Sequence, residues 1–192
     1  MIYEPLPDGG LVRKLWIGET EAYRDHLLRL DEDSRHRRFS GAVSDDVIAA
    51  HAATADELGT VVHGFFAEGV LRGAAELRHL NGMFSREAEV AFSIERDWQS
   101  LGIGTALLER TLLSARNRGI TSLRMDCMAD NRRMQQLARK FEAELKFDFG
   151  SVVGQVDPSR STPLSMLREW LEDANGVAAT MFDAQARIFG VA

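Results

Sequence analysis

Residues 88 to 108 of this chain read Ala88-Glu-Val-Ala-Phe-Ser-Ile-Glu-Arg-Asp-Trp-Gln-Ser-Leu-Gly-Ile-Gly-Thr-Ala-Leu-Leu108. The first part predicts a strand, because Val90 to Ile94 is a short apolar run that ends in the charged turn Glu95-Arg-Asp97. The last part begins a helix with apolar residues at helical spacing, which Asn117-Arg-Gly119 ends. Between them lies a loop with two glycines, Gln99-Ser-Leu-Gly-Ile-Gly104.

This arrangement predicts an anion-binding site. A glycine loop between a strand and a helix N-terminus places several unpaired backbone N–H groups around one point, with the positive end of the helix dipole behind them. The simplest ligand is a phosphate or a pyrophosphate. A P-loop is excluded because no Lys follows Gly104, and a dinucleotide-binding fingerprint is excluded because Leu107 stands where a third glycine is needed.

The spacing Gln-x-x-Gly-x-Gly after an apolar strand, with Trp98 directly before Gln99, resembles motif A of the GCN5-related N-acetyltransferase (GNAT) superfamily. Members of this superfamily bind the pyrophosphate of acetyl-CoA at that motif. Residues 131 to 140 resemble motif B of the same superfamily. The resemblance covers roughly residues 10 to 157.

Two further segments resemble the branch of the superfamily that acetylates protein lysines. Ala88-Glu-Val-Ala91 matches the strand before motif A in that branch, and Asp33-Ser-Arg-His-Arg-Arg-Phe39 is similar to a segment written roughly Glu-Ser-Arg-Tyr-x-Arg-Phe. The second segment serves only to indicate the branch. A charge run such as residues 30 to 39 usually forms a solvated or locally paired face, and we expect that here.

The resemblance implies one α/β domain, residues 1–157, with the GNAT fold. A mixed, mostly antiparallel sheet flanked by helices is expected to open at its central strand and admit acetyl-CoA. Periodicity and turn residues predict the individual elements. Strands are expected at residues 11–17, 60–67, 70–77, 90–94, 120–128, 145–149 and 151–156. Helices are expected at residues 19–30, 45–55, 105–117 and 131–141.

Residues 158–192 form an extension that the family does not require. Thr162 as N-cap and Pro163 at the first helical position begin an amphipathic helix, which Asn175-Gly176 is expected to end before a second helical segment. Because so much apolar area is rarely left exposed on a monomer, we expect both helices to pack on the domain or to join two copies in a homodimer. A lid over the site is the remaining alternative.

The resemblance also implies which residues hold acetyl-CoA. The pantetheine arm is expected to pair with the backbone of the central strand, and the glycine loop is expected to hold the pyrophosphate. The expected cofactor-binding residues are Phe92, Ser93, Ile94, Gln99, Ser100, Leu101, Gly102, Ile103, Gly104, Thr105 and Asn131. A core strand, a helix-start turn and a helix N-cap would explain these residues separately, so only their joint spacing favours a binding site.

Acetyl transfer to an amine needs a deprotonated amine, a polarised thioester carbonyl and a proton for the departing thiolate. The resemblance implies that Glu89, ten residues before Gln99, is the general base. An exposed carboxylate at a strand end is the alternative interpretation of Glu89. Glu76 on the neighbouring strand is the second candidate for the base.

The general acid is where the sequence departs from the family. Motif B usually carries a tyrosine after Leu137, and this chain has Ala138 there. Water or another side chain must then protonate the thiolate. The candidates are Ser93, Asp126 and Cys127, although Cys127 lies in an apolar alternation typical of a core residue. An acyl-enzyme is disfavoured, because no pair of nucleophile and base is visible in the sequence.

Composition limits the other functions. The chain is 45% hydrophobic and 27% charged, as soluble globular proteins are. Its net charge of -6 argues against nucleic acid or an anionic membrane as the main partner. The single Cys127 excludes an internal disulfide, and the five histidines show no metal-ligand spacing. With neither a signal peptide nor a membrane span recognisable, we expect a cytoplasmic protein without a bound metal.

We therefore expect an acetyl-CoA-dependent N-acetyltransferase that moves the acetyl group directly to a primary amine of a small molecule or a protein lysine. The alternative hypothesis is a catalytically weak acyl-CoA-binding module with a regulatory role, which Ala138 and the extension motivate. The acceptor is not determined by the sequence, because acceptor sites in this superfamily are built from variable helices and loops.

Overall fold

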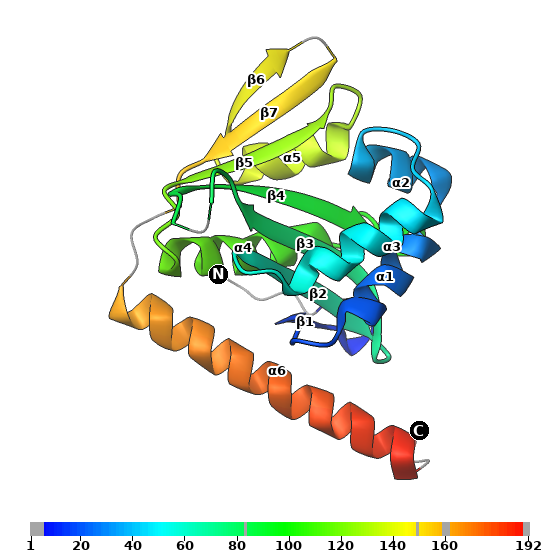
Figure 1. Ribbon diagram of the computed structural model, residues 1–192. Coiled ribbons are helices and arrows are strands. Elements are labelled where there is room, and N and C mark those ends of the chain that lie inside the picture. The colour runs from blue at the N-terminus through cyan, green and yellow to red at the C-terminus, as the bar shows by residue number, and fades with distance from the viewer. Residues whose placement is uncertain (1–5, 83, 149, 159–161, 190–192) are drawn as a thin grey trace.

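The computed structural model describes residues 6–82, 84–148, 150–158 and 162–189, and Figure 1 shows a sheet with helices on both faces. The strands are β1 (Leu11–Lys14), β2 (Thr60–Ala67), β3 (Val70–His79), β4 (Glu87–Ile94), β5 (Ser122–Met128), β6 (Glu144–Asp148) and β7 (Ser151–Val156). The α-helices are α1 (Thr20–Arg29), α2 (Glu32–Phe39), α3 (Asp45–Ala53), α4 (Ile103–Asn117), α5 (Arg132–Lys140) and α6 (Pro163–Phe189). Short 3-10 turns are η1 (Pro7–Gly9), η2 (Thr54–Asp56) and η3 (Arg96–Trp98).

The expected α/β architecture is confirmed. The strands form one seven-stranded sheet in the order β1-β2-β3-β4-β5-β7-β6, and every neighbouring pair is antiparallel except β4 and β5. The ends of some elements differ from the expectation, since β1 ends at Lys14 and β3 continues to His79. The charge run at residues 30 to 39, expected as a solvated or locally paired face, contains the helix α2, in which Arg37 pairs with Asp33.

The parallel pair β4 and β5 is the feature that shapes the rest of the sheet. Glu87 to Glu89 pair with Ser122 to Arg124, and no pairing follows. β4 nevertheless stays paired with β3 as far as Ile94, and β5 stays paired with β7 as far as Met128. The two strands therefore diverge beyond Glu89, and Figure 1 shows the sheet opening between them.

The two faces of β4 have different neighbours. Ala88 and Val90 belong to the larger core, which α4 and α5 cover. Alternate residues of a strand point to opposite faces, so Glu89 and Ser93 point to the other face, where α1 and α2 lie. A second, smaller core between the sheet and α1 and α3 includes Tyr23 and other buried apolar residues.

The C-terminal extension is one helix, so the expected break at Asn175-Gly176 is wrong. Thr162 does cap this helix, because its Oγ1 accepts from the N–H of Ser165 at 3.1 Å. Gly176 lies inside α6 against β1, where an added Cβ would come within 3.0 Å of the Cβ of Arg13. The glycine therefore permits close packing of the helix on the sheet edge, rather than ending the helix.

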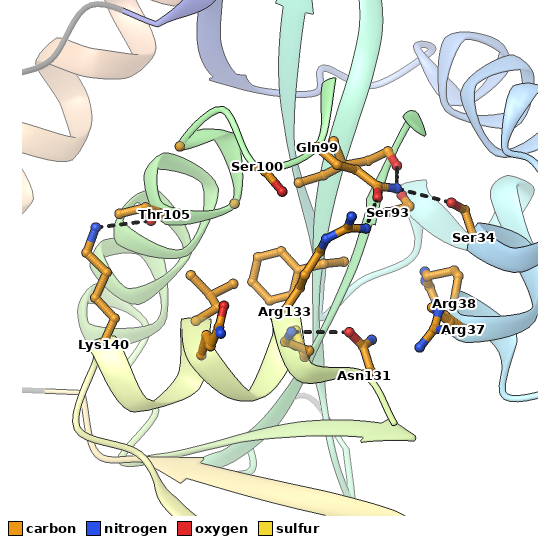
Figure 2. Close-up of a pocket in the computed structure, with 17 residues that line it drawn as sticks. Ser34, Arg37, Arg38, Ser93, Gln99, Ser100, Thr105, Asn131, Arg133 and Lys140 are labelled. Atoms are coloured by element: carbon orange, nitrogen blue, oxygen red, sulfur yellow. Dashed lines mark hydrogen bonds between the residues drawn. The ribbon is translucent and has the colours of Figure 1, made fainter. Parts of the chain in front are cut away.

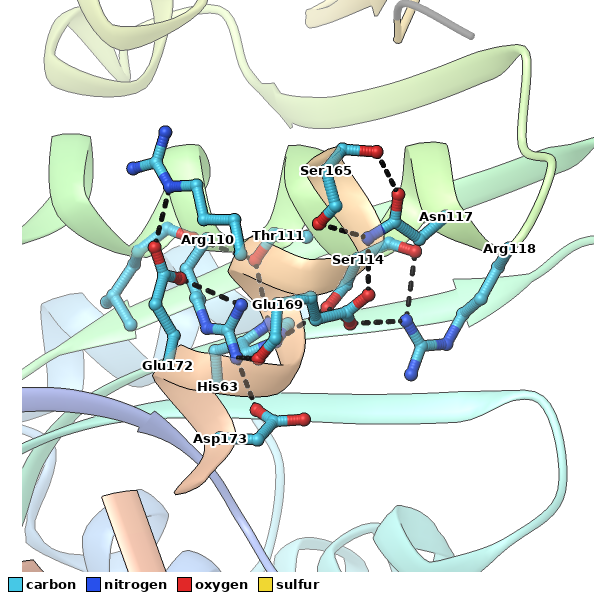
Figure 3. Close-up of polar contacts among 12 residues, drawn as sticks. His63, Arg110, Thr111, Ser114, Asn117, Arg118, Ser165, Glu169, Glu172 and Asp173 are labelled. Carbon is cyan, nitrogen blue, oxygen red and sulfur yellow. Dashed lines mark hydrogen bonds and ion pairs between the residues drawn. The ribbon is translucent and has the colours of Figure 1, made fainter. Parts of the chain in front are cut away.

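The helix α6 faces the domain with its polar side (Figure 3). Glu169 accepts hydrogen bonds from Ser114 (2.6 Å), Asn117 (2.7 Å) and Arg118 (2.8 Å) on α4 and just after its end. Arg110 of α4 forms ion pairs with two further carboxylates of α6. Five large apolar side chains in the first part of α6 are 48% to 75% exposed instead, namely Leu164, Met166, Leu167, Trp170 and Leu171. The helix therefore contacts the domain through its polar side while these five side chains stay exposed, and its use in a homodimer stays a prediction.

α6 is also the longest helix described, with 27 residues. Among the described residues, neither it nor any other helix combines the length and the apolar character that crossing a membrane requires.

Candidate active site

A cleft of about 440 Å³ lies where β4 and β5 diverge. Figure 2 shows its walls, which come from the end of β4, the glycine loop, the start of α4, α5 and α2. The expected cofactor-binding residues that line it are Phe92, Ser93, Ile94, Gln99, Ser100, Gly102, Gly104, Thr105 and Asn131. The other two do not line it, because Leu101 is 48% exposed on the outside of the loop and Ile103 is buried in the core.

The glycine loop leaves backbone donors facing this cleft. Gly102 is the N-cap of α4 with φ +82°, a left-handed conformation that favours glycine, and no side chain caps the helix. The first-turn N–H groups of Ile103 and Gly104 therefore lack an intrahelical acceptor. A Cβ at Gly104 would lie 3.6 Å from both Ile94 and Leu137, so the glycine keeps the gap between β4 and α5 open.

The charge of the cleft suits an anion. Arg37, Arg38, Arg133 and Lys140 line it, and none of its described lining residues is acidic. Lys140 donates from Nζ to Oγ1 of Thr105 at 3.3 Å, which places its ammonium group beside the first turn of α4. Cations and a helix N-terminus that face the same space reinforce each other toward a phosphate-sized anion.

The edge of β4 offers a second row of backbone donors. The N–H of Glu95 donates to the carbonyl of Arg72 on β3 at 3.0 Å. Hydrogen bonding alternates along an antiparallel strand, so the N–H groups of Phe92 and Ile94 point away from β3 and toward the gap. Because the pairing with β5 ends at Glu89, neither group has a partner on that strand.

The side chain of Gln99 crosses the cleft. Its amide nitrogen donates to the carbonyl of Ile94 at 2.8 Å and to Oγ of Ser34 at 3.1 Å, and its amide oxygen accepts from Arg133. Gln99 thus connects α2, β4 and α5 at the mouth of the cleft (Figure 2). Asn131 has a structural contact as well, because its side chain accepts from the N–H of Met134 and caps α5.

Glu89 is the last residue of β4 that pairs with β5. It is half-buried, points to the face of α1 and α2, and has no hydrogen bond or ion pair within the described part of the chain. Arg38 is near enough to interact with it electrostatically. Glu89 does not line the cleft itself, so it lies at the point where the gap begins.

Glu76, the second candidate base, has a different environment. Its side chain is 3% exposed, and it accepts from Tyr23 (2.9 Å) and Arg78 (2.6 Å), with Arg38 as a further ion-pair partner and His51 at 2.8 Å. Burial alone would raise the pKa of Glu76, but His51 and Arg38 hold it well below the usual range. A carboxylate stabilised in this way is a poor proton acceptor, which leaves Glu89 as the better candidate.

The contribution of α2 to the cleft was not predicted from the sequence. Ser34, Arg37 and Arg38 line the cleft, although this charge run was expected to form only a solvated or locally paired face. Arg37 also forms an ion pair with Asp130 at 3.1 Å, which connects α2 to the loop after β5. The only signal for these residues was the similarity of residues 33–39 to the lysine-acetylating branch.

The structure also separates the three candidates for the general acid. Cys127 is buried, burial and the charge of Asp126 raise its pKa, and Asp126 is paired with Arg124 at 2.9 Å. Ser93 alone of the three lines the cleft, and its Oγ lies 2.9 Å from Nε2 of His26. The sequence gives no sign of this pair, because 67 residues separate its members.

A mixed sheet that opens at its one parallel pair, with a Gly-x-Gly helix start and unpaired strand N–H groups facing into the opening, defines an acyl-CoA N-acyltransferase fold. The model of the Acetyltransferase (GNAT) family matches residues 11–142, and the chain belongs to this family. Family membership confirms the expected N-acetyltransferase and its co-substrate acetyl-CoA. The particular branch within the superfamily stays a prediction.

Individual acetyltransferases are similar to this chain in sequence or in structure. Acetyltransferase PA5475 of Pseudomonas aeruginosa is 30% identical over 169 residues, which cover 83% of this chain and 84% of that protein. The GNAT domain of S. lividans PAT has a similar structure, with a TM-score of 0.69 at 23% identity over 80% of this chain and 94% of that one. The paia N-acetyltransferase of Thermoplasma acidophilum, solved with coenzyme A, has a TM-score of 0.59 at 18% identity over 77% and 98%.

The different environments of Glu76 and Glu89 predict different effects on the free energy of unfolding when each is substituted. Glu76→Gln should lower the free energy of unfolding by about 3 to 5 kcal/mol, because it leaves the buried guanidinium of Arg38 without its carboxylate. Glu89→Gln should change it by less than about 0.5 kcal/mol, since no contact is lost. Urea unfolding of both variants measures this, and equal stabilities would contradict the assigned network.

Proposed function

We propose that the cleft binds acetyl-CoA, with the pantetheine arm along β4 and the pyrophosphate at the first turn of α4. The observation that carries this proposal is that β4 loses its partner β5 after Glu89, although β4 itself continues to Ile94. Its later N–H groups on that side therefore face the gap without a partner on β5. An amide-containing arm can take the place of the missing strand by hydrogen bonding to Phe92 and Ile94. Ile103 and Gly104 then hold the pyrophosphate with their N–H groups, and Lys140 adds positive charge.

We further propose that Glu89 is the general base for a primary amine that attacks the thioester directly. Its carboxylate points to the face of α1 and α2, so the amine would approach from that face while acetyl-CoA occupies the gap. A half-buried carboxylate with no bound cation is a far better proton acceptor than Glu76 in its ion pairs. Either a small-molecule amine or a lysine of a protein fits this arrangement.

The alternative, a regulatory acyl-CoA-binding module with weak catalysis, rests on one observation. Ala138 of α5 is buried, and it offers no proton donor where the family usually has a tyrosine. Both hypotheses require acetyl-CoA in the cleft, so binding supports them equally. Turnover with an amine separates them.

We also propose that α6 joins two copies of the chain. Its contacts through Glu169 and Arg110 fix the polar side against the domain, so the apolar side cannot turn inward. The exposed area of the five large apolar side chains between residues 164 and 171 is roughly 600 Å² per chain, so pairing two copies would bury on the order of 1,200 Å², the lower end of the range for specific interfaces. A symmetric pair of helices presents the same surface on both sides and needs no other partner.

Acetyl-CoA binding is tested by calorimetric titration of the native chain, Gly102→Glu and Gly102→Ala. The glutamate places a negative charge at the helix start and should weaken binding about a hundredfold or more. The alanine has the same strained backbone at φ +82° without the charge, and should retain most of the affinity. A native chain that does not bind, or a Gly102→Glu variant that binds like the native chain, would refute the site.

Glu89→Gln tests the base. The substitution removes the proton acceptor with little change in shape, so turnover of acetyl-CoA with a panel of primary amines, including lysine peptides, should fall about 100- to 10,000-fold. Affinity for acetyl-CoA should not change, which the same titration checks. Undiminished turnover would exclude Glu89 as the base, and a native chain without turnover on any amine would favour the binding module.

The proposed dimer predicts a concentration-dependent mass in sedimentation experiments. Trp170→Glu should weaken association by about 2 kcal/mol, or roughly thirty-fold, because it puts a charge at the centre of the apolar side. Val47→Glu is the matched control, since Val47 is 51% exposed on α3. A native chain that stays monomeric throughout, or a Trp170→Glu variant that associates as tightly as the native chain, would contradict this role of α6.

A further inference from the structure

Ser93 is the first of three side chains in hydrogen-bond contact at the edge of the cleft. Its Oγ lies 2.9 Å from Nε2 of His26 on α1, and Nδ1 of the same ring lies 3.2 Å from Oε1 of Glu95. Ser93 lines the cleft, whereas His26 is fully buried behind it. A serine, a histidine and a carboxylate connected in this order form the arrangement that activates a serine nucleophile.

Glu95 determines which way the imidazole of His26 works. An ionised carboxylate only accepts, so the ring carries its proton on Nδ1 and its Nε2 accepts from the hydroxyl of Ser93. Arg29 and Arg72 donate to the two carboxylate oxygens of Glu95 at 2.9 and 3.0 Å and hold it in place. Burial raises the pKa of Glu95, but the hydrogen bonds from His26 and Arg72 lower it by more. The pKa of Glu95 therefore lies below its usual value, and the carboxylate stays ionised.

The protonation state of His26 also allows it to act as a base. Burial lowers the pKa of its imidazole, although the hydrogen bond to Glu95 opposes this. The ring is therefore neutral near pH 7, with a free lone pair on Nε2 for the hydroxyl proton.

Backbone donors for an oxyanion flank the serine. The N–H groups of Phe92 and Ile94, on either side of Ser93, face the gap because the pairing of β4 with β5 has ended. The thioester is the reactive end of the arm, so we place its carbonyl at one of these two donors beside the hydroxyl of Ser93, while an amide of the arm takes the other. Donors directed at a developing oxyanion are the second element that acyl transfer to a serine requires.

We propose that Ser93, His26 and Glu95 give this chain a second activity, the hydrolysis of acyl-CoA thioesters through an acyl-serine. The hydroxyl oxygen of Ser93 attacks the thioester carbonyl, its proton passes to Nε2 of His26, and the C–S bond breaks as His26 returns the proton to the coenzyme A sulfur. Water then attacks the acyl-serine ester and gives its proton to His26, which returns it to Oγ of Ser93 as the free acid leaves. This inference rests on the proposed binding of acyl-CoA in the cleft.

The proposal also supplies the proton that Ala138 cannot. The histidine that deprotonates Ser93 is at hand when the thiolate departs, so no tyrosine on α5 is needed for this reaction. A purely structural role, in which His26 and Arg29 fasten α1 to Glu95, would account for the ion pairs but would require no reaction at Ser93.

The experiment incubates the full chain with acetyl-CoA in the absence of any amine and follows both free thiol and acetate. The native chain should release the two in equal amounts. Ser93→Ala and His26→Gln should each lower this rate about 100-fold or more, while titration shows that they still bind acetyl-CoA. His36→Gln, a change at an exposed histidine of α2 away from the cleft, should keep the native rate.

Ser93→Cys provides a second readout, because a thiol of similar size keeps the nucleophile. It should take up one acetyl group at residue 93, detected by peptide mass spectrometry. A native chain that binds acetyl-CoA without releasing acetate, a Ser93→Ala variant as active as the native chain, or a Ser93→Cys variant that binds acetyl-CoA and stays unmodified would overturn the proposal. A native chain that does not bind acetyl-CoA would overturn the proposed function as well, and the titration separates the two failures.

Discussion

The structure depends on one constraint, the early end of the pairing between β4 and β5. Parallel strands bond through evenly spaced backbone groups, so once the two strands diverge, every later N–H of β4 on that side lacks a partner. β3 and β7 each hold one of the diverging strands in place, which keeps the gap open without a ligand. An unpaired strand edge inside a domain would be unfavourable unless something else bonded to it, and we propose that the amide-bearing arm of acetyl-CoA does so.

Two buried carboxylates organise the face of the sheet opposite α4. Glu76 forms ion pairs with Arg38 and Arg78, and Glu95 forms ion pairs with Arg29 and Arg72. Each carboxylate therefore connects a helix to the sheet. Removing one partner from such a network leaves a buried charge, which makes both networks costly to change. Glu89 of β4 lies two residues before Ala91, the residue paired with Glu76, and forms no ion pair within the described part of the chain. The charged groups that stabilise the fold are thus distinct from the carboxylate that we propose as the general base.

The helix α6 shows how specific polar contacts override hydrophobic pattern. An amphipathic helix is expected to turn its apolar side to its own domain. Here the partners on α4 and beside it are polar and charged, among them Ser114, Asn117 and Arg110, and burying them under leucines would leave them unsatisfied. The helix therefore offers its acidic side inward, and its apolar side remains available for a second chain.

The sequence by itself determined the local features of this protein: the strand, the glycine loop and the helix around Gly102, the cofactor motif, and most element positions up to residue 157. These follow from periodicity, turn chemistry and spacing, all of which act over short distances along the chain. Tertiary structure decided the rest. It brought His26 to Ser93, placed Arg38 of α2 at the cleft, and turned the polar side of α6 inward. Contacts between residues tens of positions apart depend on packing and charge pairing, and no local pattern records them.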